Sequence, residues 1–175
     1  MSALNENSKL QTVNIDRIMD EGVVFTDAHT SSSVSTPSRY SLLTGRYNWR
    51  SDMKQGVLNG YSKSLIRPDR RTIAHVLRDN GYTTACIGKW HLGWNWNNIE
   101  NGTDKVDFSK SVTEGPTTHG FDYFYGISGS LDMAPYVYLE NDKPTALPNR
   151  VTGNKEKFSW WREGPTASDF VHEQV

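Results

Sequence analysis

The stretch from Thr72 to Ile87 limits the chain to folds in which helices and strands alternate. Thr72 is a favoured helix N-cap residue and Gly81 a favoured terminator, so we expect a helix over Ile73–Asn80. Tyr82–Ile87 follows at once and is rich in β-branched and apolar residues, which favours a strand. Helix, glycine and strand in this order form the αβ unit of a parallel sheet, so the sequence predicts an α/β fold. The side chains expected to face the core are Ile73, Val76 and Leu77.

The same kinds of signal predict further elements along the chain. The segment Trp94–Lys110 is rich in Asn, Asp and Gly, which indicates an inserted loop. Capping residues, β-branched runs and turn residues mark the other elements. These are a helix from Thr12 to Glu21, a strand over Val23–Thr26, a hairpin of Tyr136–Glu140 and Pro144–Leu147, and a helix that begins near Thr166 or Ser168.

The stretch from Ser35 to Arg46 contains a short helix with a polar start. Pro37 suits the first helical position because it has no N–H group to leave unpaired. Thr36 would then be the N-cap, and Gly45 would follow the last turn as a C-cap glycine. We therefore expect a helix of about two turns, with Ser35 just before its N-terminus.

Ser35 and Arg39 are candidates for a reactive anion site. The N-terminus of a helix carries partial positive charge and free N–H groups, and Arg39 in the first turn adds a full charge. A hydroxyl in this position is a candidate nucleophile for a phosphate or sulfate ester. The other interpretation is a Ser or Thr that caps an ordinary surface helix, which is common.

The hexapeptide Gly88–Gly93 follows the predicted strand, at the edge where open α/β sheets bind ligands. Lys89 and His91 are two positions apart, so in extended backbone their side chains point the same way. Lysine offers a fixed positive charge to an anion, and histidine exchanges a proton near neutral pH. Taken alone, the pair favours the other interpretation, a solvated lysine and a capping histidine.

Composition excludes several classes of partner. Nineteen Lys and Arg against 20 Asp and Glu give a formal net charge of −1, so nothing indicates a nucleic-acid partner. The single cysteine, Cys86, excludes an internal disulfide framework. We expect no membrane span and see no signal peptide before the first element. The hydrophobic content of 35% is low for a self-contained α/β core, which fits a core completed by further residues.

Two of these stretches together resemble the type I sulfatases. Ser35–Arg46 contains Ser-x-Pro-Ser-Arg and Leu-Thr-Gly-Arg, which resemble the serine-type form of the sulfatase signature. Gly-Lys-Trp-His-Leu-Gly resembles the second landmark of that family. In sulfatases the Cys or Ser at the position of Ser35 is oxidised to formylglycine, and the residues matching Lys89 and His91 contact the sulfate and the formylglycine. The resemblance runs from about Leu10 to the C-terminus.

A third stretch, His-Gly-Phe-Asp from His119, also resembles the family, where it precedes a turn that brings a Ser and an Asp to the site. Ser130 would then hydrogen-bond in the sulfate pocket, and Asp132 would lie near the substrate. An ordinary Gly-Ser turn and a turn-capping aspartate are the other interpretations. The resemblance thus implies catalytic roles for Ser35, Arg39, Lys89 and His91, and substrate contacts for Ser130 and Asp132.

The resemblance implies an alkaline-phosphatase-like α/β fold of mixed or parallel strands flanked by helices, and residues 1–175 would form only part of it. Sulfatases normally begin with a strand ending in an Asp-Asp pair that binds calcium, and further metal ligands follow later in their chains. Among the calcium contacts of the family, this chain retains only the position of Ser35. Because Ca²⁺ prefers several oxygen ligands, we expect an incomplete site and a chain that is not a competent enzyme alone.

The implied reaction is hydrolysis of a sulfate ester, expected to be that of a sulfated carbohydrate or small molecule. One oxygen of the hydrated formylglycine attacks sulfur and displaces the alcohol, and the second hydroxyl then expels sulfate. A serine precursor implies maturation by a radical-SAM enzyme of anaerobic bacteria, and a periplasmic or secreted location in the full-length form. Two alternatives stay open: a phosphoester or phosphonate hydrolase of the same superfamily, and a non-catalytic binding module in which Ser35 remains a serine.

Overall fold

The computed structural model describes residues 1–97, 105–153 and 160–175. It divides into two compact units, Met1–Thr30 and Ser31–Val175. Part of the predicted loop Trp94–Lys110, residues 98–104, lies outside the described residues.

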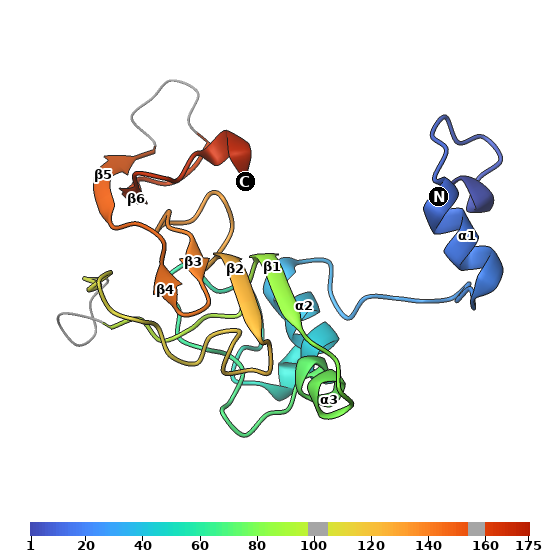
Figure 1. Cartoon of the computed structure of the whole chain (residues 1–175), viewed down its shortest axis with the longest axis horizontal. Coiled ribbons are helices and arrows are strands. Elements are labelled where there is room, and N and C mark those ends of the chain that lie inside the picture. The colour runs from blue at the N-terminus through green and yellow to red at the C-terminus, as the bar shows by residue number, and fades with distance from the viewer. Residues whose placement is uncertain (98–104, 154–159) are drawn as a thin grey trace. The chain divides into compact units, whose positions relative to one another are not determined.

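The first unit contains the 3-10 helix η1 (Ser2–Leu4) and the helix α1 (Val13–Glu21) (Figure 1). Thr12 precedes α1 and Gly22 follows it, which confirms the predicted helix. The predicted strand Val23–Thr26 is wrong. No described residue pairs with this segment, and Phe25 is 80% exposed. A strand needs a neighbour for its backbone hydrogen bonds, so β-branched composition alone does not produce one.

The second unit is built on a mixed sheet with the strand order β1-β2-β3-β4 (Figure 1). Strands β1 and β2 are parallel, and Gly88 lies opposite Gly126. Strands β3 and β4 continue the sheet antiparallel, while β5 and β6 form a separate antiparallel pair. This mixed sheet with flanking helices confirms the predicted α/β class. The strands are β1 (Ala85–Lys89), β2 (Tyr123–Ile127), β3 (Leu139–Glu140), β4 (Lys143–Pro144), β5 (Pro148–Thr152) and β6 (Gly164–Ala167).

Two predictions near the C-terminus have different outcomes. The hairpin is confirmed, because β3 and β4 pair across the turn at Asn141 and Asp142, although both strands are shorter than predicted. The helix expected from Thr166 or Ser168 is wrong, because Thr166 lies in β6 opposite Arg150. Only the 3-10 helix η3 (His172–Gln174) follows.

Helix α2 (Ser35–Thr44) begins two residues earlier than the sequence indicates, and it leads into the 3-10 helix η2 (Asn48–Arg50). Its N-cap is Val34, so Ser35 is the first helical residue and Thr36 is not the cap. Pro37 is accommodated because none of the first-turn N–H groups has a partner within a helix. The C-terminus agrees with the prediction: Gly45 has φ 66° and donates its amide to the Ser41 carbonyl.

Helix α3 (Ile73–Asp79) is confirmed, including its N-cap Thr72, but its buried face is not the predicted one. Ala74 is fully buried, whereas Ile73 and Val76 are each 50% exposed. The reason lies in Thr72, whose hydroxyl donates to the His119 carbonyl and turns this side of α3 toward the core.

Aromatic side chains dominate the core of the second unit. Trp90 and Trp94 come from the loop after β1, and Phe124 comes from β2. Trp94 meets Phe124 edge-on, with the ring centroids 6.0 Å apart.

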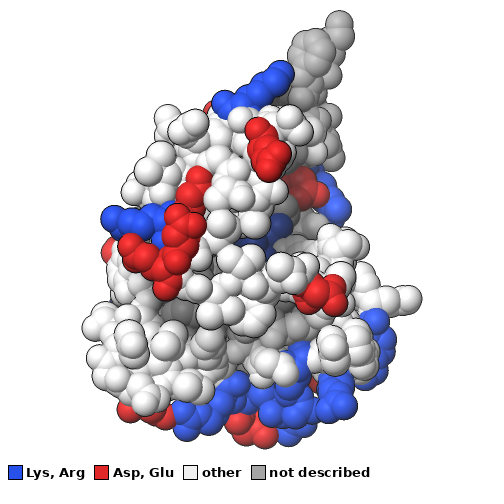
Figure 2. All heavy atoms as spheres, turned by 90° about the vertical axis from the view of Figure 1, so that its right-hand side faces the viewer, with Lys and Arg blue, Asp and Glu red and all other residues white. Residues whose placement is uncertain are grey.

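Figure 2 shows that most of the face in view carries neither acidic nor basic side chains. Among the described residues, no helix combines the length and apolar character needed to cross a bilayer.

Candidate functional site

Ser35 lies at the N-terminus of α2, and its hydroxyl oxygen contacts two predicted site residues. Arg39, one turn further along the helix, donates from Nε to Ser35 Oγ at 3.0 Å. His91, in the loop after β1, places Nδ1 at 2.9 Å from the same oxygen. The fold therefore brings together residues that are 56 positions apart in sequence.

The partners of His91 determine which of its ring nitrogens carries the proton. Nε2 lies 2.7 Å from the Leu58 carbonyl, which can only accept, so Nε2 is protonated. In a neutral imidazole Nδ1 is then the acceptor, and the Ser35 hydroxyl donates to it. Burial lowers the pKa of His91; the Leu58 hydrogen bond opposes this, and the nearby charges of Lys89 and Arg39 reinforce it. His91 is therefore a neutral base poised against Ser35.

The side chain of His91 is not oriented by extended strand backbone, although the two-residue spacing from Lys89 predicts that it is. The strand β1 ends at Lys89, and His91 has φ 55°, in the left-handed region that is costly for a non-glycine residue. Two hydrogen bonds hold this conformation: the His91 amide donates to the Ser128 carbonyl at 3.0 Å, and the Thr36 hydroxyl donates to the His91 carbonyl at 2.9 Å. Thr36 thus fastens the first turn of α2 to the His91 loop instead of capping the helix.

Arg39 links the start of α2 to the end of β1. Besides its contact with Ser35, it donates from a terminal guanidinium nitrogen to the Lys89 carbonyl at 2.6 Å. Burial lowers the pKa of Arg39 from its ordinary value, and guanidinium groups remain charged at neutral pH. A fixed positive charge therefore lies next to the Ser35 oxygen.

Lys89 and Ser130 form a second contact on the Arg39 side of the site. The Lys89 ammonium donates to Ser130 Oγ at 3.3 Å. Burial lowers the pKa of Lys89, the Arg39 charge adds to this, and Asp132 opposes it. Asp132 lies at the rim, where its carboxylate is 3.7 Å from the Arg162 guanidinium. Arg39 and His91 thus each contact Ser35, Lys89 connects Arg39 to Ser130, and Asp132 contacts Arg162 and none of these three directly in the described residues.

The described residues do not form a calcium site. None of them gathers three or more His, Cys, Asp or Glu side chains in a way that could hold a metal. The side chains that contact Ser35 Oγ are Arg39 and His91, a cation and a neutral base, and calcium requires several oxygen ligands. The described part of the chain therefore does not fit the ion.

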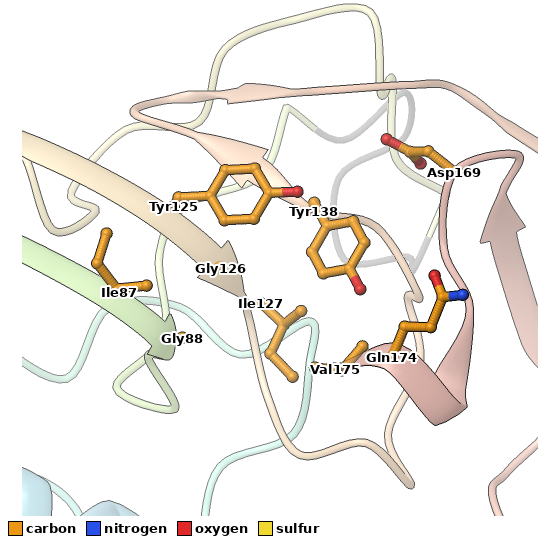
Figure 3. A pocket seen from close by; sticks show the side chains of 9 residues that line it. All are labelled: Ile87, Gly88, Tyr125, Gly126, Ile127, Tyr138, Asp169, Gln174 and Val175. Carbon is orange, nitrogen blue, oxygen red and sulfur yellow. The ribbon is translucent and has the colours of Figure 1, made fainter.

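A pocket of about 400 Å³ lies on the sheet, and none of the predicted site residues lines it (Figure 3). Tyr125 and Tyr138 stack there with ring centroids 5.4 Å apart. Asp169 and Gln174 come from the C-terminal stretch and complete its polar lining. This hollow is separate from the contacts around Ser35, so its volume does not mark the reactive site.

The amino-acid sequence of this chain matches a family model and several known proteins. The family model described as Sulfatase matches residues 1–162. An N-acetylgalactosamine-6-O-sulfatase of Bacteroides thetaiotaomicron is 38% identical over 167 residues, covering 94% of this chain and 31% of that protein. Human steryl-sulfatase is 41% identical over 127 residues, covering 70% of this chain and 20% of that protein.

Solved structures agree with these sequence matches. A Bacteroides thetaiotaomicron structure from work on the metabolism of multiple glycosaminoglycans has a TM-score of 0.65 and 39% identity, covering 83% of this chain and 29% of that one. The protein Ps i-CgsB, solved in complex with k-i-k-neocarrahexaose, has a TM-score of 0.57 and 25% identity, covering 82% and 33%. The chain therefore spans about a third or less of the length of the proteins it matches.

Proposed function

This chain belongs to the sulfatase family, and from that premise we propose that the protein hydrolyses sulfate esters at residue 35. The observation that carries the proposal is the position of the Ser35 hydroxyl, between the Arg39 guanidinium and the neutral His91 ring. A nucleophile next to a fixed charge and a base is the arrangement that ester hydrolysis requires.

The cations of the site have an electrostatic role in this proposal. A sulfate ester carries negative charge on three oxygens, and the N-terminus of α2, Arg39 and Lys89 offer donors and positive charge to them. Burial of Arg39 and Lys89 weakens solvent screening, so each contact is stronger than at an exposed position. These donors are in place before the ester arrives, which favours the transition state.

Residue 35 and His91 carry the chemical step. A formylglycine derived from Ser35 would, in its hydrated form, supply both the attacking oxygen and the hydroxyl that later releases sulfate. His91 Nδ1, at 2.9 Å, accepts the proton of the residue-35 oxygen. The Leu58 carbonyl holds the opposite nitrogen and keeps Nδ1 directed at this oxygen. Arg39 Nε stabilises the negative charge that develops there.

The substrate proposed is a sulfated carbohydrate, and N-acetylgalactosamine 6-sulfate is the first candidate because a relative 38% identical to this chain is named for it. The proposal includes maturation by a radical-SAM enzyme and a periplasmic or secreted location for the full-length protein. Hydrolysis of an aryl sulfate in preference to the matching aryl phosphate, by protein produced with the maturation enzyme, is the expected result. A preference for the phosphate would instead favour the phosphoester alternative.

Replacing Lys89 by alanine is expected to weaken the binding of inorganic sulfate by about 1.5–3 kcal/mol, the range for a hydrogen bond to a charged group. The cause is loss of the ammonium that adjoins Arg39 and Ser130. Calorimetric or NMR titration of the 175-residue chain with sulfate measures the change. Lys143→Ala is the matched control, because Lys143 lies exposed on β4 and should leave the affinity unchanged. Equal affinity of the wild type and Lys89→Ala would contradict the assignment.

A further inference from the structure

A separate part of the chain reaches the rim of the candidate site beyond Lys89. Ser130 accepts a hydrogen bond from Lys89 and belongs to a turn that the Met133 amide closes on the Ser130 carbonyl at 2.9 Å. Asp132 lies within this turn, and its carboxylate is 3.7 Å from the guanidinium of Arg162. Arg162 is therefore connected to the anion-binding residues through a single short turn.

Buried neighbours fix the backbone around Arg162. Its amide donates to the Asp132 carbonyl at 3.1 Å, and its carbonyl accepts from the hydroxyl of Tyr136 at 2.6 Å. Tyr136 is only 1% exposed. The preceding residue, Trp161, stacks on the buried His172 with ring centroids 4.0 Å apart and an interplanar angle of 17°. The segment that carries Arg162 therefore has a defined position in the fold.

The exposed side chains of this segment contribute little to the stability of the fold. The Arg162 side chain is 63% exposed, and an ion pair at that exposure contributes little to stability. Trp160 is 60% exposed, although its ring meets Trp161 edge-on at 5.6 Å. An exposed indole loses the burial that normally stabilises it. A buried anchor with an exposed indole and guanidinium is typical of a binding surface.

The chemistry of this group matches a sugar ring. The flat face of an indole suits the apolar C–H face of a sugar. A guanidinium donates hydrogen bonds to hydroxyl oxygens, while the neighbouring Asp132 carboxylate accepts them from hydroxyl protons. A sulfated sugar offers these groups together with an anion for Arg39 and Lys89. The pocket of Figure 3 lacks a cation among its lining residues and so does not offer this combination.

We propose that Trp160 and Arg162, together with Asp132, bind the sugar ring whose sulfate group occupies the site at Ser35. This inference rests on the proposed function and names the residues that determine its substrate class. Arg162 and Trp160 take no part in the chemical step. They increase the affinity for a sulfated sugar over that for inorganic sulfate.

The test compares two probes, N-acetylgalactosamine 6-sulfate and inorganic sulfate, titrated into the full chain by calorimetry or NMR. The wild type should bind the sugar sulfate more tightly than inorganic sulfate. Arg162→Ala and Trp160→Ala should each weaken binding of the sugar sulfate roughly tenfold and leave inorganic sulfate unchanged. Two matched controls should change neither affinity: Arg67→Ala, from an exposed pair with Asp69 at 3.2 Å, and Trp49→Ala, from an indole that is 50% exposed.

Each outcome separates this inference from the proposed function. Equal affinity of the wild type for both probes, or unchanged binding of the sugar sulfate in both variants, overturns the inference. Inorganic sulfate binding that depends on Lys89 would still support the function in that case. A wild type that binds neither probe counts against both. Trp160→Phe and Arg162→Lys, which keep an aromatic ring and a charge, give the same comparison if an alanine variant does not fold, with smaller losses expected for the sugar sulfate alone.

Discussion

Replacing Ser35 by alanine is expected to lower the turnover of a sulfate ester by at least about a thousandfold, because it removes the oxygen that both Arg39 and His91 contact. The variant leaves those two side chains and the helix in place. Loss of activity should therefore occur with unchanged circular dichroism and unchanged unfolding behaviour. The measurement is kcat/KM for an aryl sulfate in a form of the protein that turns it over.

Ser41→Ala is the matched control for this prediction. Ser41 lies in the same helix as Ser35, near the opposite end, and its hydroxyl is remote from the reaction proposed here. It should retain near wild-type turnover. A Ser35→Ala protein that keeps more than a few per cent of the wild-type rate would remove residue 35 from the mechanism and leave the binding-module interpretation in its place.

Acid should destabilise the second unit through His119. This residue is fully buried, its Nε2 lies 3.2 Å from the Ser64 hydroxyl, and its ring stacks on Trp90. Burial, with a further contribution from the nearby charge of His75, lowers the pKa of His119 from 6.5 to about 4. Between these two pH values the unfolded chain binds more protons than the folded chain. Stability is therefore complete above about pH 6.5 and is lost as the pH falls toward 4.

The expected loss from this residue is about 2 kcal/mol between pH 7 and pH 5, measured as the free energy of unfolding in urea. His119→Gln cannot take up the proton, so its unfolding free energy should depend less on pH over the same range by a similar amount. The lowered pKa values of His75, His91 and His172 act in the same direction and leave some dependence in the variant. An equal loss of stability in wild type and variant would show that His119 is not the source.

Local signals in the sequence predicted the elements that depend on local chemistry. The capping residues Thr12 and Thr72 fixed the starts of α1 and α3, and Gly45 fixed the end of α2. The hairpin followed from its Asn-Asp turn at 141–142. These features involve hydrogen bonds between residues close in sequence, which is why composition and spacing were sufficient.

Features that depend on distant partners were not predictable in this way. Val23–Thr26 has the composition of a strand and no partner among the described residues. The exposed face of α3 is set by the contact of Thr72 with His119, 47 positions away. Thr36 has the chemistry of an N-cap, yet its hydroxyl binds the His91 carbonyl and accepts from the Leu58 amide.

In the candidate site, too, some features could be predicted from the sequence and others could not. Spacing and resemblance selected Ser35, Arg39 and His91, and the fold brings them into contact. The Leu58 carbonyl was missed because every residue has one, so no side-chain pattern marks it. The left-handed backbone of His91 was missed as well, because residue 91 is neither Gly nor Asn, the residues that most commonly adopt this conformation. Both features decide which nitrogen faces Ser35.

The mass of the tryptic peptide Ile18–Arg39 tests the central claim, that the reaction takes place at residue 35, most directly. It is measured on protein produced with a radical-SAM maturation enzyme and compared with protein produced without it. Conversion of Ser35 to formylglycine removes two hydrogens, so we expect a peptide about two mass units lighter, and only in the matured, active sample. Sulfatase activity from protein whose peptide keeps the full serine mass would contradict the account.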